Sequence, residues 1–226
     1  MTGHTMTEPG LTDQLAAEVK PKLRGWLHAA TVPLALIGGI LLIVFAPTVL
    51  GKVGAAVYLA CSLLLFGNSA VYHRGNWGPK AKAALRRVDH ANIFLFIAAS
   101  YTPLTLLLLE GGSRTALLVL IWSAAILGVL FRVFWLSAPR WLYVVLYLAM
   151  GWAAIGWLPQ FWATGGPLIV ALIGAGGVLY SLGAITYALK RPNPFPAWYG
   201  FHEIFHTCTI LAACCHFTAI ALSTFR

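Results

Sequence analysis

Charged residues are scarce in this sequence. They make up 9% of its 226 residues, against roughly 25% in soluble domains. A soluble fold needs a wetted surface, and so few charges cannot supply one, whereas a bilayer solvates an apolar exterior. With 60% of its residues hydrophobic, the chain is therefore excluded from the soluble globular class and is predicted to be an all-α, polytopic membrane protein.

Acidic residues are fewer still. Asp and Glu number 6 against 15 Lys and Arg, which gives a net charge of +9. Such an excess on a soluble protein would suggest nucleic-acid binding. Here, basic residues that flank membrane spans on the cytoplasmic side explain it, so we predict the lipid bilayer as partner and no nucleic acid.

The sequence also lacks any C-x-x-C pair. Its four cysteines all fall in apolar segments: Cys61, Cys208, Cys214 and Cys215. This placement predicts small buried packing residues rather than disulfides or metal ligands.

The apolar residues form seven segments, each close to the roughly 20 residues that cross a bilayer as a helix. They lie near residues 26–46, 52–73, 89–109, 115–135, 141–159, 167–188 and 202–222. The sequence thus predicts one seven-transmembrane bundle over residues 26–226. Residues 1–25 are predicted to be a cytoplasmic tail, with a short amphipathic helix over 11–19. No cleavable signal peptide is expected, because residues 1–19 are polar and the first apolar run is too long.

Basic residues predict the orientation. With the N-terminus inside, twelve of the fifteen Lys and Arg residues fall on the cytoplasmic side, and only Lys52, Arg114 and Arg226 fall outside. The positive-inside rule then places the N-terminus in the cytoplasm and the C-terminus outside. The inside set is Lys20, Lys22, Arg24, Arg74, Lys80, Lys82, Arg86, Arg87, Arg132, Arg140, Lys190 and Arg191.

This topology brings distant polar residues to one membrane depth. Ser69 and His73 end the second span on the cytoplasmic side, and Asp89 opens the third span there. His202 and His206 lie at the same level, at the start of the seventh span. Ionisable groups inside a membrane are costly and usually functional, so we expect a site at this depth.

The residue types suggest a metal site. His202 and His206 are four residues apart, so they share one helical face, and His73 is the natural third ligand. Three imidazoles with one open position are typical of catalytic zinc, although nickel, cobalt or iron would also accept them. Asp89 could bind the metal directly, but we rather expect it to orient and deprotonate a water there. Ser69 is expected to donate a hydrogen bond to a substrate carbonyl.

Each of these residues also has a simpler explanation. Ser69 could bond back to the carbonyl of Leu65. Asp89 could cap a helix or pair with Arg86 or Arg87. Three further histidines are interpreted as membrane-interface anchors: His28, His90 and His216.

Residues 202–206 also read H-E-x-x-H, the zinc-binding helix of many metalloproteases, in which the Glu is the general base. That interpretation needs a third ligand downstream. His216 is about 15 Å farther along the helix, and no Asp follows Asp89. A protease is therefore the weaker interpretation, and Glu203 stays outside the predicted catalytic set.

In these residues the chain resembles the hemolysin III / progestin and adipoQ receptor family of seven-span membrane proteins. The family signature is S-x3-H, an Asp at the head of the third span, and H-x3-H on the last; Ser69/His73, Asp89 and His202/His206 match it. Further matching stretches are GNSAVYHR (67–74), LRRVDHANIFLFIAASYTP (85–103), VLYLAMGW (145–152), GGVLYSLGAITY (176–187) and HEIFHTCTILAACCHF (202–217).

The resemblance implies a zinc held by His73, His202 and His206, with Asp89 and Ser69 near its water. It implies kinship with membrane hydrolases, so we expect a zinc-dependent hydrolase of a lipid amide or ester bond in a bacterial inner membrane. Two alternatives stay open: a receptor-like regulator of membrane state whose zinc is structural, and a cytolytic protein. The substrate and the oligomeric state do not follow from the sequence.

Overall fold

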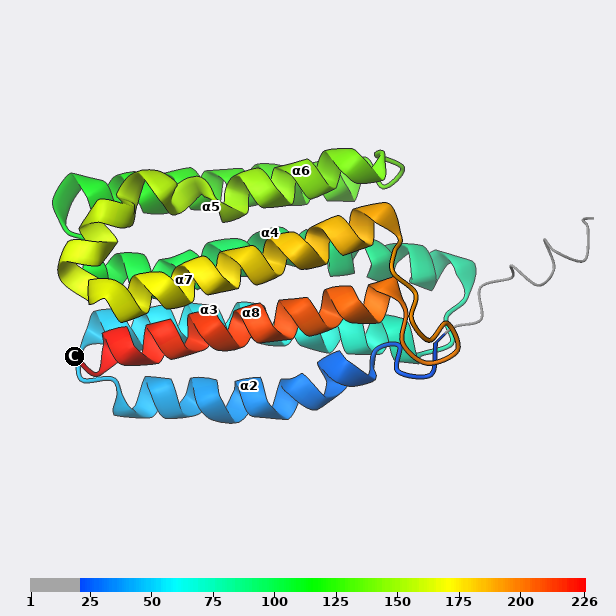
Figure 1. Ribbon diagram of the computed structural model, residues 1–226, viewed down its shortest axis with the longest axis horizontal. Coiled ribbons are helices and arrows are strands. Elements are labelled where there is room, and N and C mark those ends of the chain that lie inside the picture. Colours follow the sequence, from blue (N-terminus) through cyan, green and yellow to red (C-terminus); the bar gives the residue numbers. More distant parts are fainter. Residues whose placement is uncertain (1–20) are drawn as a thin grey trace, which may run out of the picture.

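The computed structural model describes residues 21–226, and its long elements are all α-helices (Figure 1). The prediction of an all-α membrane protein is confirmed, whereas the amphipathic helix expected over 11–19 lies outside the described residues. The elements are α2 (Trp26–Phe45), α3 (Val49–Arg74), α4 (Pro79–Leu108), α5 (Gly111–Phe134), α6 (Arg140–Gly151), the 3-10 helix η1 (Ala153–Trp157), α7 (Leu158–Leu189) and α8 (Phe201–Thr224).

The helix boundaries follow from local chemistry. Thr48 precedes α3, and its side chain accepts a hydrogen bond from the backbone N–H of Gly51 at 3.0 Å, which satisfies one of the free donors at a helix start. Pro79 occupies the first turn of α4, where its missing N–H removes no helical bond. Pro139 immediately precedes α6. Helix α4, which contains the third predicted span, begins at Pro79 and thus ten residues before the predicted start of that span. Asp89 therefore lies inside the helix and not at its first residue.

Six helical segments are long and apolar enough to cross a membrane. One of them, Arg140–Leu189, has 50 residues and contains two of the seven predicted spans. It folds back on itself: Arg140 donates to the carbonyl of Tyr187 at 3.1 Å, and the Trp152 indole N–H donates to Ser181 at 3.0 Å. Gly166, with φ of 78°, interrupts the helix near the turn. The total of seven spans remains a prediction.

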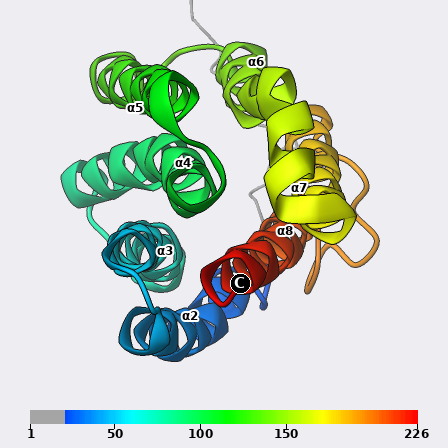
Figure 2. The same ribbon diagram turned by 90° about the vertical axis from the view of Figure 1, so that its left-hand side faces the viewer.

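The helices follow one another in a ring (Figure 2). Successive helices α2 to α5 pack side by side, α7 packs closely on α8, and α8 closes the ring by contacting α2 and α4. The C-terminus of α3 and the N-termini of α4 and α8 thereby meet at one end of the bundle (Figure 1). The predicted inside set of basic residues, from Lys22 onward, lies in the loops and helix ends of this same end.

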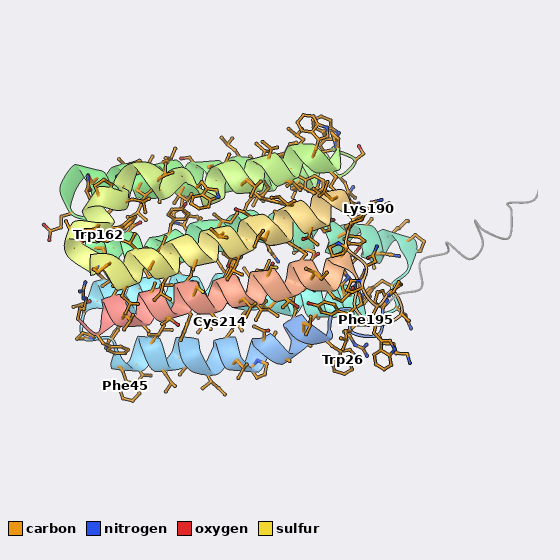
Figure 3. The ribbon with its side chains drawn as sticks, in the orientation of Figure 1. Trp26, Phe45, Trp162, Lys190, Phe195 and Cys214 are labelled. Carbon is orange, nitrogen blue, oxygen red and sulfur yellow. The ribbon has the colours of Figure 1, made fainter. Side chains whose placement is uncertain are left out.

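The outer surface of the bundle is apolar. Trp26, Phe45 and Trp162 are each more than half exposed, and Figure 3 shows them near the two ends of the bundle, where interfacial aromatic residues lie in membrane proteins. All four cysteines are free thiols. Cys61 is buried as predicted, whereas Cys208 and Cys215 are only half-buried and Cys214 is exposed on the outer face of α8. The prediction of a buried Cys214 is therefore wrong, because lipid can solvate an apolar thiol as well as a protein core can.

Gly54 fixes the close approach of α3 to α4. A Cβ at this position would lie 2.7 Å from Pro103 Cα, whereas a Cβ at Gly67 on the same helix would meet nothing within 4 Å. We expect Gly54→Ala to reduce the free energy of unfolding by about 1–3 kcal/mol, because two backbones would have to separate. Gly67→Ala is the matched control and should be neutral or stabilising. Thermal unfolding in detergent measures both, and equal melting temperatures would contradict the close contact.

Candidate metal centre

Three histidines converge at the end of the bundle that holds the basic residues. His73 lies in the last turn of α3, while His202 and His206 occupy the first two turns of α8. One ligand atom from each lies within 4.8 Å of the others, a grouping that can hold a metal ion. We call these three residues the imidazole cluster. The sequence predicted that the three histidines would lie at one depth in the membrane, and the structure shows that they also lie next to one another.

The rings of the imidazole cluster face one another. His73 Nε2 and His202 Nε2 are 3.2 Å apart. The ring centroid of His206 lies 4.5 Å from that of His202 and 5.3 Å from that of His73. His206 is only 2% exposed, and His73 is 8% exposed. The three nitrogen donors are therefore concentrated, with His73 and His206 buried and His202 half-buried.

Asp89 and Ser69 lie beside the cluster. Asp89 Oδ2 is 3.8 Å from His73 Nε2, which is longer than a hydrogen bond, and Ser69 lies close to the Asp89 carboxyl group. Both residues are buried. The five residues singled out from the sequence therefore gather in one place.

The simpler explanations of Asp89 and Ser69 do not fit the described residues. Helix α4 begins at Pro79, so Asp89 caps no helix, and it forms no ion pair with Arg86 or Arg87. Ser62 and Ser100 do bond back to carbonyls four residues earlier, whereas Ser69 does not bond to Leu65.

Two other histidines are not the interface anchors that the sequence suggested. His28, in the first turn of α2, is buried and stacks on the His206 ring at 3.8 Å with an interplanar angle of 11°. His90 is buried, and its Nδ1 lies 2.9 Å from Arg132 Nη2. The signal for His28 was available, because the predicted first span also begins on the cytoplasmic side. Nothing in the sequence indicated that Arg132, at 0% exposure, would be buried against His90.

Glu203 has a structural role. It is fully buried, and its Oε2 accepts a hydrogen bond at 2.9 Å from the backbone N–H of Gly200, which precedes α8. Its other oxygen forms an ion pair with Arg24, from the segment that leads into α2. Both carboxylate oxygens of Glu203 thus stabilise the start of the helix that carries His202 and His206. This arrangement supports leaving Glu203 out of the catalytic set.

Breaking this ion pair should destabilise the protein. Arg24→Ala leaves a buried carboxylate without its partner, so we expect a loss of about 2–3 kcal/mol, or roughly 5–10 °C in melting temperature in detergent. Adding Glu203→Gln should recover part of the loss, since glutamine is neutral and can still accept the Gly200 N–H. A double variant no more stable than Arg24→Ala would contradict this account.

An elongated cavity leads away from the imidazole cluster into the bundle. Ser69, Asp89, His202 and His206 line one end of it. From there most of the lining side chains are apolar or aromatic, contributed by α4, α6, α7 and α8, as far as Leu104, Phe161 and Gly174. Asp89 and Leu104 are fifteen positions apart on α4, so the cavity extends about 20 Å along the bundle.

Comparison with known proteins agrees with the signature. The sequence profile described as "Haemolysin-III related" matches residues 17–217. The chain is 32% identical to the "Hemolysin-3 homolog" of Bacillus subtilis, over 77% of this chain and 83% of that protein. It is 31% identical to "Hemolysin-3" of Bacillus cereus, over 77% and 81%. It is also 27% identical to the human "Monocyte to macrophage differentiation factor", over 86% and 80%.

Proposed function

The chain belongs to the haemolysin-III-related family, and from that premise we propose that it is a zinc-dependent hydrolase of an amide or ester bond in a membrane lipid. One observation carries this proposal. A three-imidazole donor set, a carboxyl group and a hydroxyl group lie together at the end of an elongated, mainly apolar cavity. The family membership alone does not specify an activity.

The donor set fits zinc. At Zn–N distances of about 2.0–2.1 Å, two ligand nitrogens of a tetrahedral site are about 3.3 Å apart, and His73 Nε2 and His202 Nε2 are separated by 3.2 Å. Neutral imidazole is a preferred zinc ligand. Three protein ligands leave the fourth position open, as in catalytic sites.

The residues around the donor set have distinct roles in this proposal. Zinc, when bound, would polarise a carbonyl group and acidify a water molecule. The Asp89 carboxylate, 3.8 Å from a ligand nitrogen, would accept the proton of the attacking water and later return it to the leaving group. The Ser69 hydroxyl would donate a hydrogen bond to the carbonyl oxygen as negative charge develops there.

The cavity suggests the substrate class. Its length of about 20 Å is a large part of the roughly 30 Å hydrocarbon core of a bilayer. Its wall is mainly apolar, with the proposed reacting groups at one end. An acyl chain would fill the apolar part and present its carbonyl carbon at the imidazole cluster. A lipid amide or ester has this shape and polarity.

We also propose the membrane placement. The chain is a multi-pass membrane protein, and seven spans with the N-terminus inside would put the basic end of the bundle in the cytoplasm. The imidazole cluster would then lie at the cytoplasmic face of a bacterial inner membrane. Cysteine labelling of single-cysteine variants at Lys80 and Arg114, from either side of the membrane, would test this orientation.

Turnover of lipids by the purified protein tests the hydrolase. Zinc-loaded protein in nanodiscs would be incubated with N-acyl amides and acyl esters, and released fatty acid would be measured by mass spectrometry. We expect zinc-dependent release from at least one of these classes. Release that persists unchanged after chelation, or no release from any lipid, would contradict the proposal.

A structural zinc is the second candidate, because the imidazole cluster joins α3 to α8, two helices far apart in the sequence. In that case Asp89→Asn would leave every phenotype unchanged, whereas loss of a ligand would lower thermal stability.

The name of the bacterial relatives also raises cytolysis as a possible function. A dye-leakage assay in liposomes tests it, and the mainly apolar cavity wall argues against a water-filled pore.

A further inference from the structure

The segment that leads into α2 lies against the imidazole cluster. Gly25, with φ of 81°, is so close to α3 that a Cβ on it would lie 2.8 Å from His73 Cβ. Three residues later, His28 is 3% exposed, and its ring contacts the ring of His206 on α8. Residues 25–28 thus touch both helices that carry the imidazole cluster, although its three donor residues all come from α3 and α8.

The contact between His28 and His206 is a face-to-face stack. Their ring centroids are 3.8 Å apart, and their ring planes differ by only 11°. The other rings that contact His206 in residues 21–226 are inclined to it by 56–61°. Phe66 of α3 in turn meets the His28 ring edge-on, with their centroids 5.1 Å apart. The ring that lies parallel to His206 is therefore itself supported by a second ring.

This stack excludes His28 as a further ligand of the same metal. An imidazole binds a metal through a lone pair in the plane of its ring, so a zinc bound by His206 would lie close to the plane of that ring. Stacked rings cannot approach much closer than about 3.5 Å, and these two planes are nearly parallel. The zinc would therefore lie roughly 3 Å or more outside the plane of His28, where no lone pair of that ring is directed.

A ligand ring must nevertheless be held in one plane. The torsion that turns a histidine ring about its Cβ–Cγ bond has a broad energy minimum, so packing has to select one orientation. Turning the His206 ring would swing its ligand nitrogen away from those of His73 and His202, which lie within 4.8 Å of it. The stack opposes this turn, because the turn would drive an edge of the His206 ring into the face of His28.

The face of the His28 ring, and not its nitrogen atoms, makes this contact. Both ring nitrogens of His28 are buried, and neither has a hydrogen-bond partner in the part of the chain that the structure describes. Another flat ring could therefore take the place of His28, whereas an aliphatic side chain could not.

We propose that His28 is a positioning residue, which holds the ring of His206 in the plane that metal binding requires. This inference rests on the proposal that the imidazole cluster binds zinc, and it does not require that the protein hydrolyse a lipid. It gives α2 a part in the metal centre, although this helix carries no residue of the family signature.

Metal titration of the full-length protein in detergent tests the positioning role. Zinc affinity would be measured by competition with a chelator, and cobalt(II) would be bound in place of zinc, because its visible absorption reports the geometry of its ligands. We expect His28→Leu to weaken zinc binding about 10–100-fold, as the loss of residues that support metal ligands does, and to alter the cobalt spectrum. His28→Phe keeps a flat ring and should retain both the affinity and the spectrum of the unaltered protein.

His216→Leu is the matched control. It makes the same substitution at another histidine that lines the cavity, as His28 does, but His216 lies outside the imidazole cluster. This variant should change neither the zinc affinity nor the cobalt spectrum. The melting temperature of the metal-free protein is recorded as well, since a role of His28 in folding alone would lower that temperature and leave the cobalt spectrum unchanged.

The outcomes separate this inference from the proposed metal centre. Unchanged zinc affinity and an unchanged cobalt spectrum in His28→Leu would overturn the positioning role and leave the metal centre standing. Equal losses in His28→Leu and His28→Phe would overturn the stack as the cause. Failure of the unaltered protein to bind either metal would overturn the metal centre itself. If His28→Leu does not fold, His28→Gln, which also lacks a ring, is measured against the same expectations.

Discussion

Replacing His206 by alanine should remove zinc from the protein. His206 supplies one of three nitrogen donors that lie within 4.8 Å of one another. Loss of residues that merely support metal ligands weakens affinity about 10–100-fold, so loss of a ligand should weaken it by more than about 100-fold. Metal analysis of purified protein should show stoichiometric zinc in the unaltered chain and almost none in His206→Ala.

His216→Ala is the matched control for this experiment. The residue is also an imidazole on α8, but it lies about 15 Å farther along the helix and outside the imidazole cluster. This variant should retain its zinc. Stoichiometric zinc in His206→Ala, or equal zinc loss in both variants, would show that the imidazole cluster is not the metal site.

Asp89→Asn should abolish turnover while zinc remains bound. Asparagine has nearly the same shape as aspartate, but it cannot accept a proton from the attacking water. Removing a general base typically lowers a rate about 10²–10⁴-fold, and we expect a fall in kcat within that range for the lipid identified as substrate. Zinc content and melting temperature should change little, because Asp89 lies beside the ligand nitrogen of His73 and not at bonding distance.

Glu203→Gln separates this mechanism from that of a metalloprotease. In a protease of the H-E-x-x-H type, Glu203 would be the general base and its loss would stop the reaction. Here both Glu203 oxygens are already engaged, with Arg24 and with the Gly200 N–H, so the variant should lose stability and keep kcat. Normal kcat in Asp89→Asn together with its loss in Glu203→Gln would reverse the two assignments.

Much of the candidate site could be predicted from charge and hydropathy. Basic residues fixed the predicted direction of each span, and the direction determined which end of a span Ser69, Asp89 or His202 would occupy. The structure places these residues together at one end of the bundle. The prediction worked because a bilayer restricts helices to nearly parallel orientations, so that depth follows from position in the sequence.

Lateral position was harder to predict. His90 follows Asp89 directly, yet it points to Arg132 of α5, whereas Asp89 points to the imidazole cluster. His28 shares the predicted depth of the site, but its stacking on His206 depends on α8 closing the ring beside α2. Depth is one coordinate of three, and the other two depend on which helices are neighbours.

By itself the sequence determined the class of protein, the apolar spans, and the depth of Ser69, His73, Asp89, His202 and His206, since these follow from solvation of residues by lipid or water. Only the tertiary structure decided that the three imidazoles face one another, that Glu203 stabilises a helix start, and that His28 stacks on His206. Such features depend on helix rotation and on close approaches at glycines such as Gly25 and Gly54. They arise from packing between segments far apart in the chain, which no local pattern of residues specifies.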